Sequence, residues 1–321
     1  MNQMILPEGR LIQTVENTRY CATLQGLEQA QSEGVILEGM ALHCQDQVGI
    51  SVSLGGFQGF VPWNEGALGL AQGEVREIAV LCRIGRPISV IVTDIIIEEE
   101  DITVILSRGL AQKRAKDQLM SLPAGTVLPA TVTRLEPFGA FVDVGCGVPS
   151  LLSIDRISVS RIGHPSQRFH EGDEIYVAIL EHDWASDRIR VTHRELLGTW
   201  EENASKFSVG MTIPGIVRSI KNYGIFVELL PNFSGLAEYQ EGLEEDEMVS
   251  VYIKGIVPER MKCKLLIIGS LPQATPSEVT YLLPPQGRFY RWKYSPDGCL
   301  KRSSETEFST EWRNPTPPLF E

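Results

Sequence analysis

Two segments of this chain carry the same glycine-centred aromatic pattern at the same place in a larger unit. The first is FGAFVD at residues 138–143, and the second is YGIFVE at residues 223–228. Gly125 and Gly210 open the alternating runs that precede them, and each feature recurs after 85 residues. Aromatic rings on the surface of a sheet are unfavourable in water unless another group packs on them. The repeat therefore constrains function as well as fold.

The length of 321 residues predicts two to four domains, and a hydrophobic content of 43% is normal for globular protein. Residues 1–6 contain no Lys or Arg, so no signal peptide is indicated. The longest apolar stretch, residues 88–97, is interrupted by Thr93 and Asp94 and is too short to span a membrane. We therefore expect a soluble cytosolic protein with no membrane partner.

The net charge of −12 weighs against a diffuse, high-affinity binder of polyanions. Acidic residues concentrate in residues 34–108, around Glu98-Glu99-Glu100-Asp101, and again at residues 244–247. Such clusters are ordinarily solvated loops. The alternative is that residues 98–101 dock a basic partner, such as a ribosomal protein.

No motif of catalysis or cofactor binding stands out. The chain has no Walker loop, no G-x-G-x-x-G and no Ser/His/Asp constellation, and its six cysteines form no C-x-x-C pair. His164, His170, His182 and His193 cluster in one β-rich unit, but their spacings fit no pattern of metal ligands. We interpret them as solvated surface histidines, and we expect neither a metal, nor a cofactor, nor an enzymatic activity.

The clearest β-rich unit is residues 122–196. Its expected strands are residues 126–132, 138–144, 151–152, 174–180 and 188–192. Five short strands with a longer connection between the third and fourth are typical of the OB-fold, a small Greek-key barrel. Residues 208–269 repeat this arrangement. Residues 34–108 give a degenerate version, in which Gln47 and Ile50 are expected at the positions of the aromatic pair.

Shorter segments connect these units. Residues 1–33 predict an irregular segment and a short helix that Thr23 caps and Gly34 ends, and residues 109–121 and 197–207 predict helical linkers. The fold class is therefore mainly β, with tandem five-stranded OB-fold barrels joined by short helices. Residues 270–321 form a tail with a predicted β-hairpin. The tail's alternating cations and rings favour two interpretations, a cover on the edge of the third barrel or an extra platform for single strands.

In an OB-fold the second and third strands and the flanking loops usually form the oligonucleotide surface. Strict alternation would place Phe138 and Phe141 on opposite faces of a strand. If Phe138 lies in the loop that enters the strand, a twist at Gly139 brings both rings to one side, and Gly224 does the same for the second pair. The competing interpretation is that these rings belong to the barrel core.

The segment from Gly125 through FGAFV at residues 138–142 to RIRVT at residues 188–192 resembles the S1 RNA-binding repeat. That family is named for the largest protein of the bacterial small ribosomal subunit. Residues 208–268 resemble it nearly as well and residues 35–107 more weakly, and their order is similar to that of the short S1-like proteins of Gram-positive bacteria. The resemblance implies a non-enzymatic RNA binder whose binding face combines the aromatic pair, a third-strand histidine and a fifth-strand arginine.

Position by position, the resemblance implies the following RNA contacts: Phe138, Phe141, Ser153 and Arg188 in the second repeat, and Tyr223, Phe226 and Lys262 in the third. Ser153 and Glu238 stand where the family has its histidine, and Glu238 is expected to repel phosphate. Strand position alone adds further candidate phosphate contacts, which are Arg190, Arg218, Lys221 and Lys264.

The favoured hypothesis is weak binding of single-stranded RNA, including mRNA, with low sequence specificity and a role in translation. Single-stranded RNA and the small ribosomal subunit are the candidate partners. The second repeat is expected to bind RNA better than the third, and the first least. The alternative is a protein-interaction scaffold of OB-fold repeats. An accessory module for a nuclease is disfavoured, because no nuclease domain accompanies the repeats.

Overall fold

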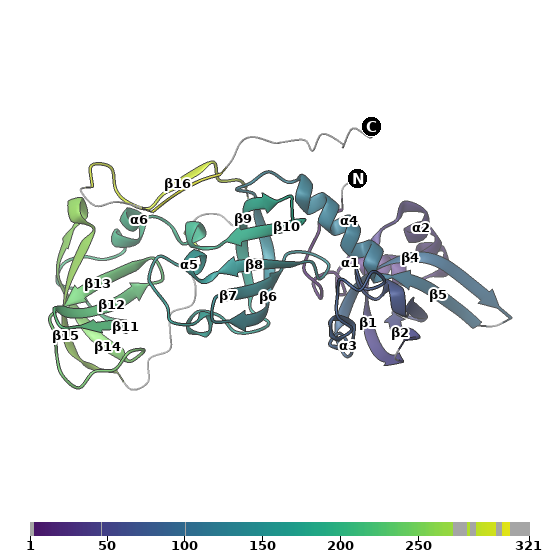
Figure 1. Cartoon of the computed structure of the whole chain (residues 1–321), viewed down its shortest axis with the longest axis horizontal. Coiled ribbons are helices and arrows are strands. Elements are labelled where there is room, and N and C mark those ends of the chain that lie inside the picture. Colours follow the sequence, from purple (N-terminus) through teal and green to yellow (C-terminus); the bar gives the residue numbers. More distant parts are fainter. Residues whose placement is uncertain are drawn as a thin grey trace. The chain divides into compact units, whose positions relative to one another are not determined.

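The computed structural model describes residues 3–45, 47–99, 101–271, 281–282, 287–299 and 304–308. Within these residues the strands form three closed five-stranded barrels and a two-stranded sheet (Figure 1). Short helices connect the barrels. The predicted fold class is therefore confirmed.

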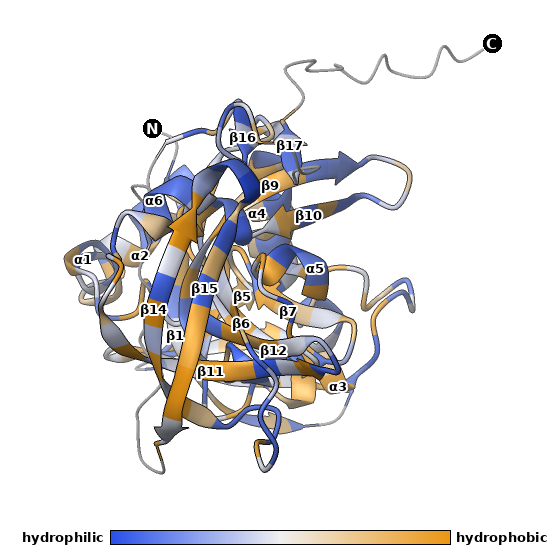
Figure 2. Cartoon of the chain, turned by 90° about the vertical axis from the view of Figure 1, so that its left-hand side faces the viewer, coloured by the Kyte–Doolittle hydropathy of each residue, from blue (hydrophilic) through white to orange (hydrophobic). Residues whose placement is uncertain are grey.

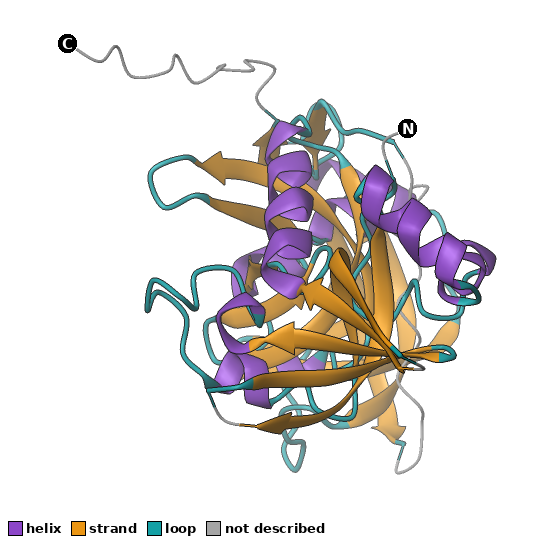
Figure 3. Ribbon diagram, turned by 90° about the vertical axis from the view of Figure 1, so that its right-hand side faces the viewer, coloured by secondary structure: helices purple, strands orange, loops and turns teal. Residues whose placement is uncertain are grey.

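Helices α1 (Val15–Cys21) and α2 (Leu24–Glu33) precede the first barrel. Thr23 caps α2 by accepting a hydrogen bond from the amide of Gly26, and Gly34 ends the helix with φ 63°. The sequence predicted α2 and its caps correctly but missed α1, whose N-cap is Thr14. The end-on view in Figure 3 shows helices packed outside the strands of the first barrel, where α2 and α4 (Arg108–Ser121) contact its fourth strand.

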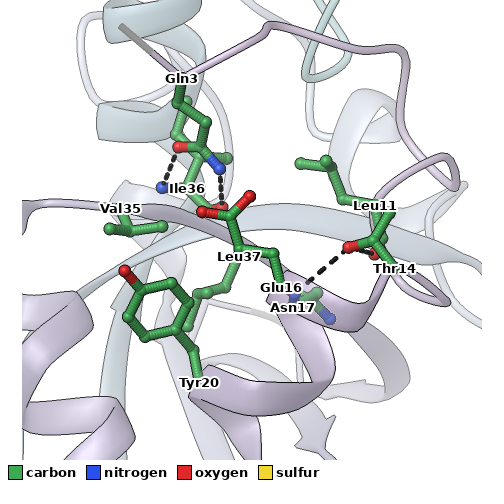
Figure 4. Close-up of a pocket in the computed structure, with 9 residues that line it drawn as sticks. All are labelled: Gln3, Leu11, Thr14, Glu16, Asn17, Tyr20, Val35, Ile36 and Leu37. Atoms are coloured by element: carbon green, nitrogen blue, oxygen red, sulfur yellow. Dashed lines mark hydrogen bonds between the residues drawn. The ribbon is translucent and has the colours of Figure 1, made fainter. Parts of the chain in front are cut away.

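The N-terminal segment is held against this barrel by side-chain contacts with the backbone (Figure 4). The Gln3 amide accepts a hydrogen bond from the Ile36 N–H at 2.9 Å and donates one to the Ile36 carbonyl at 2.8 Å. Asn17 and Tyr20 line a small hollow beside them, with a volume of about 10 Å³. A space of this size admits about one water molecule, so it is no site for a small ligand.

The first barrel has the strand order β1-β2-β3-β5-β4, in which β3 and β5 run parallel and the other pairs antiparallel. Alternate residues of each strand fill its core, as Ile50, Val52 and Leu54 do. The elements are β1 (Ile36–Gln45), β2 (Gly49–Leu54), β3 (Phe57–Pro62), η1 (Trp63–Glu65), α3 (Ile78–Leu81), β4 (Pro87–Glu98) and β5 (Asp101–Ser107).

The second barrel follows α4 and has the order β10-β8-β7-β6-β9. The long connection predicted between its third and fourth strands is present, and it holds two short helices that the sequence did not predict. The elements are β6 (Val127–Glu136), β7 (Gly139–Asp143), β8 (Pro149–Ser153), α5 (Ile154–Ile157), η2 (Pro165–Gln167), β9 (Glu174–Asp183), β10 (Arg188–Thr192) and η3 (Arg194–Leu197).

The third barrel follows α6 (Trp200–Ala204), which begins with the predicted capping box of Thr199 and Glu202. The order is β11-β12-β13-β15-β14, and Figure 2 shows a continuous apolar stretch in β15. The elements are β11 (Thr212–Lys221), β12 (Gly224–Leu230), β13 (Phe233–Ala237), β14 (Met248–Val257), η4 (Pro258–Arg260) and β15 (Lys262–Ser270).

The described part of the tail packs on the barrels rather than standing apart. β16 (Arg291–Lys293) pairs antiparallel with β17 (Glu305–Glu307). The turn predicted at residues 295–298 lies between these two strands. Trp292, Tyr294 and Phe308 are buried in the core of the second and third barrels. The Tyr294 hydroxyl donates to the Asn232 carbonyl at 2.6 Å. These contacts favour a covering role over an extra RNA platform.

The contacts divide the chain into two compact units. One consists of Met1–Leu122, Pro129–Thr131 and Val142–Ser150, and the other of the remaining residues, so the division does not follow the barrels. The domain boundaries drawn from the sequence remain a prediction. None of the helices in the described ranges has the length and apolar character needed to cross a membrane.

Candidate nucleic-acid interface

The two aromatic pairs have the same geometry on the outer surface of their barrels. The ring centroids of Phe138 and Phe141 are 6.1 Å apart at 90°, and those of Tyr223 and Phe226 are 6.2 Å apart at 89°. Phe138 is 55% exposed and Tyr223 is 66% exposed, whereas the second ring of each pair is half-buried. Each pair therefore presents one free ring that its partner supports edge-on. The rings are surface residues rather than core residues.

The glycine inside each pair is required by close packing against the next strand. A Cβ on Gly139 would lie 2.4 Å from the Leu152 carbonyl oxygen, and one on Gly224 would lie 2.5 Å from that of Ala237. Their φ angles of 158° and 147° are also unfavourable for residues with a side chain. The glycine thus lets the first ring stay in the loop while the second enters the strand.

A row of outward residues links each aromatic pair to the cations of the fifth strand. In the third barrel Phe226 pairs with Leu236, which pairs with Lys264. In the second barrel Leu151 pairs with Arg190 in the same way. The registers therefore align Arg190 with Lys264 and Arg188 with Lys262, as the sequence predicted. The sequence did not single out the intervening leucines, although both lie two residues before the position that the family reserves for histidine.

That histidine position lies beside the glycine in both barrels. Ser153 is half-buried, and its Cα would be 3.0 Å from a Cβ on Gly139. Glu238 is exposed, and its carboxylate accepts a hydrogen bond from the Lys254 ammonium group at 3.2 Å. The charge that was expected to repel phosphate is therefore partly compensated by a neighbouring lysine.

The cations of the two barrels face different residues across the sheet. Arg190 forms an ion pair with Glu181 at 3.0 Å, and Arg188 lies opposite Asp183. In the third barrel, Lys262 and Lys264 lie opposite Val257 and Gly255. The cations of the third barrel thus have no acid directly across the strand pair.

The charged residue next to the aromatic pair also differs between the two barrels. Lys221 is exposed and pairs with Gly224 at the start of the third barrel's hairpin. The corresponding residue of the second barrel is Glu136, which forms an ion pair with Arg134. The third aromatic pair therefore has a lysine where the second has a glutamate, although Glu245 lies close to it and accepts a hydrogen bond from the Ile220 N–H at 3.4 Å.

Arg218 occupies a different environment from the one the sequence suggested. Its side chain is 7% exposed, and its guanidinium donates to Glu228 at 3.0 Å and to Asp246 at 2.8 Å. Arg168 binds the same Glu228 carboxylate at 2.7 and 2.9 Å. Burial alone would raise the pKa of Glu228, but the two arginines hold it below its usual value. Because Arg218 is enclosed in this cluster, we omit it from the candidate phosphate contacts.

The first barrel has the same backbone arrangement at this site, but different side chains occupy it. Gly49 plays the part of Gly139, since a Cβ there would lie 2.3 Å from the Val61 carbonyl oxygen. Val48 and Ser51 therefore occupy the aromatic positions, and the assignment of Gln47 and Ile50 was wrong. The error arose because the hairpin of β2 and β3 is one residue shorter, and Ile50 is a buried core residue.

Thr103 and Ile105 take the places of the two fifth-strand cations in the first barrel. The register shows this, because Ile105 pairs with Phe60 as Arg190 pairs with Leu151. The first barrel thus lacks both the rings and the cations that the other two barrels present.

His193 is a core residue, so its assignment to the surface was wrong. Its Nδ1 donates to the Ile157 carbonyl at 2.7 Å, and its Nε2 lies 3.2 Å from the Tyr281 hydroxyl. Burial lowers its pKa to about 4. The signal that we missed was its place in the alternation after Ile189 and Val191. Among the described residues, no group of three or more His, Cys, Asp or Glu side chains could hold a metal ion.

Comparison with known proteins identifies the second barrel. Residues 121–194 match the family model of the S1 RNA binding domain, which confirms the resemblance seen in the sequence. The Bacillus subtilis small ribosomal subunit protein bS1 homolog is 31% identical over 209 residues, covering 59% of this chain and 54% of the relative. The bS1 protein of Staphylococcus aureus strain COL is 33% identical over 193 residues, covering 55% and 49%. The chain spans about half the length of these curated relatives.

A crystal structure of a multidomain protein with nucleic acid binding domains from Streptococcus pneumoniae is also similar. It covers 75% of each chain at 15% identity and a TM-score of 0.25. This likeness is too distant to add to the assignment of the site.

Proposed function

We propose that this chain, whose residues 121–194 form an S1 RNA binding domain, binds single-stranded RNA with low sequence specificity through its second and third barrels. In this proposal the chain catalyses no reaction, and it acts in the cytoplasm. The proposed partners are mRNA and the small ribosomal subunit, since the relatives are small ribosomal subunit proteins.

The observation that carries this proposal is the duplicated aromatic pair. Phe138 and Tyr223 are more than half exposed at equivalent positions, and each is fixed by a second ring. Every base has a π face, so exposed rings bind bases with little regard to sequence, at about 1–3 kcal/mol for each stacked base. Fifth-strand cations on the same face supply contacts to phosphate.

The proposed division of labour is as follows. Phe138, Phe141, Tyr223 and Phe226 stack bases, Arg188, Arg190, Lys221, Lys262 and Lys264 contact phosphates, and Ser153 lies beside the second barrel's glycine as a polar contact. We assign the first barrel no RNA contact, because it has Val48 and Ser51 in place of rings. Its surface fits better the alternative role of a protein-interaction module.

The test is a double substitution in the full chain, Phe138→Ala with Phe141→Ala. We expect the second barrel's contribution to the free energy of binding a short unstructured RNA to fall by about 2–5 kcal/mol, because both stacking rings are lost. Fluorescence anisotropy with a labelled oligonucleotide measures the affinity, and thermal unfolding checks that the fold survives.

A matched control is Leu110→Ala, which removes an exposed apolar side chain from α4. This variant should bind RNA as the parent does. If the double variant unfolds, or if it binds as tightly as the parent, the rings are not a stacking platform.

A further inference from the structure

The connection between β8 and β9 of the second barrel docks on the outer face of the third barrel. The Ser160 N–H donates to the Pro231 carbonyl at 3.0 Å, and its hydroxyl lies 2.7 Å from that of Ser234 on β13. Arg168, at the far end of the docked segment, holds Glu228 on β12. All of these residues belong to one compact unit, and Figure 1 shows α5, where this connection begins, beside the third barrel.

The docked segment borders the third barrel's aromatic platform. On β12, Phe226 precedes Glu228 by two residues, and on β13, Leu236 follows Ser234 by two. Residues two apart in a strand point to the same face and lie about 7 Å apart. Glu228 pairs with Ser234 and Phe226 pairs with Leu236, so the dock and the platform are adjacent rows of one surface. The second barrel therefore forms a wall along one side of the third barrel's site.

Most charges of this wall are paired. Arg168 and Arg218 form ion pairs with Glu228 and Asp246, and the exposed Glu245 accepts a hydrogen bond from the Ile220 N–H at 3.4 Å. Arg161 follows the anchored Ser160 directly and is exposed. Within the part of the chain that the structure describes, Arg161 forms no ion pair. Arg161 is therefore an exposed cation that directly follows a residue docked on the third barrel.

We propose that the RNA site of the third barrel is shared between two barrels, and that Arg161 of the second barrel contacts the phosphates of a strand whose bases stack on Tyr223 and Phe226. A guanidinium suits this role, because its planar array of N–H donors matches phosphate oxygens. This inference rests on the proposed function. It adds that the third barrel binds RNA fully only when the second barrel is docked on it.

The test isolates the third barrel within the full chain. Phe138→Ala with Phe141→Ala removes the second platform, so the remaining binding to a short oligouridine reports the third. Adding Arg161→Gln to this background should lower affinity about fivefold at 0.1 M salt and flatten the slope of log K against log salt by about 0.7, the value for one phosphate contact. Arg161→Lys should restore most of the salt slope.

The matched control is Lys206→Gln in the same background, which removes one exposed positive charge just after α6. It should leave both the affinity and the slope unchanged. The proposal is overturned if Arg161→Gln binds like its parent, or if Lys206→Gln weakens binding equally, which would indicate a general charge effect. Absence of RNA binding by the unmodified chain would instead contradict the proposed function itself.

Discussion

At the scale of single residues, the site depends on two glycines at which any side chain would meet the neighbouring strand. Gly139 and Gly224 combine a positive φ with a carbonyl oxygen within 2.5 Å of where a Cβ would be. Their role is steric, because the second strand must approach the third closely while its first aromatic residue remains in the loop. The exposed ring and the half-buried ring then meet edge to face.

We expect Gly224→Ala to lower the free energy of unfolding by about 1–3 kcal/mol, because the added methyl group meets the Ala237 carbonyl and φ is strained. Urea unfolding measures the change. Gly255→Ala in the same barrel is the control, since a Cβ there meets nothing within 4 Å. Equal stability of the two variants would show that the close approach carries no cost.

His193 gives a residue-scale prediction that depends on pH. Its pKa is about 4 in the folded chain, against an ordinary value of 6.5. Between these pH values the unfolded chain binds the proton and the folded chain does not, so acidification from pH 6.5 to 4 should destabilise the fold by about 3 kcal/mol through this group.

His193→Gln should remove this contribution, whatever its effect at neutral pH. The measurement is urea unfolding of the parent and the variant at several pH values from 7 to 4. A parent and a variant with the same pH dependence would mean that His193 is protonated as readily in the folded chain as in the unfolded one.

At the scale of elements, β10 and β15 carry equivalent cations in different electrostatic settings. Arg190 shares its charge with Glu181, whereas Lys264 lies opposite Gly255. Lys254 also forms an ion pair with Glu238, which together with the acidic run at residues 244–247 led the sequence to favour the second repeat. The ranking expected from the sequence remains a prediction, and we propose instead that the third barrel supplies the larger electrostatic share of RNA binding.

In the full chain, Lys262→Gln with Lys264→Gln should flatten the slope of log K against log salt by about 1.4, or about 0.7 for each phosphate contact. Arg188→Gln with Arg190→Gln should flatten it by less, because carboxylates already offset the second barrel's cations. Affinities over a range of salt concentrations test this order. A larger effect from the arginine pair would restore the ranking inferred from the sequence.

At the scale of the whole molecule, the second and third barrels meet through buried polar contacts. Asn232 is fully buried and donates to the carbonyls of Arg194 and Gly198 at 2.7 and 2.8 Å. Glu228 joins Arg168 of one barrel to Arg218 of the other. Because each of these buried polar groups has a hydrogen-bond partner across the interface, we expect the two barrels to unfold together.

Glu228→Gln should destabilise this unit by about 3 kcal/mol, because it leaves the buried Arg168 guanidinium without a carboxylate and Arg218 with Asp246 alone. Glu238→Gln is the matched control on the same barrel, and loss of its exposed pair with Lys254 should change stability by about 1 kcal/mol or less. Calorimetry measures both. If Glu228→Gln were as mild as its control, the dock would not depend on the ion pair.

The sequence by itself determined the features that depend on neighbours along the chain. Alternation with a period of two located the strands, Thr23 and Gly34 delimited α2, and the 85-residue repeat aligned the aromatic pairs with Arg188 and Lys262. These signals are readable because backbone geometry fixes them over a few residues. The same local reasoning failed at Gln47 and Ile50, where a hairpin shortened by one residue shifted the register.

Only the tertiary structure decided which charges face each other. Arg168 and Glu228 are 60 residues apart in sequence, yet they pair, and Glu228 also binds Arg218. The compensation of Glu238 by Lys254 and the burial of His193 likewise depend on which segments pack together. Coulomb interactions and desolvation depend on distance in space, so the availability of each cation for RNA cannot be read from its position in the chain.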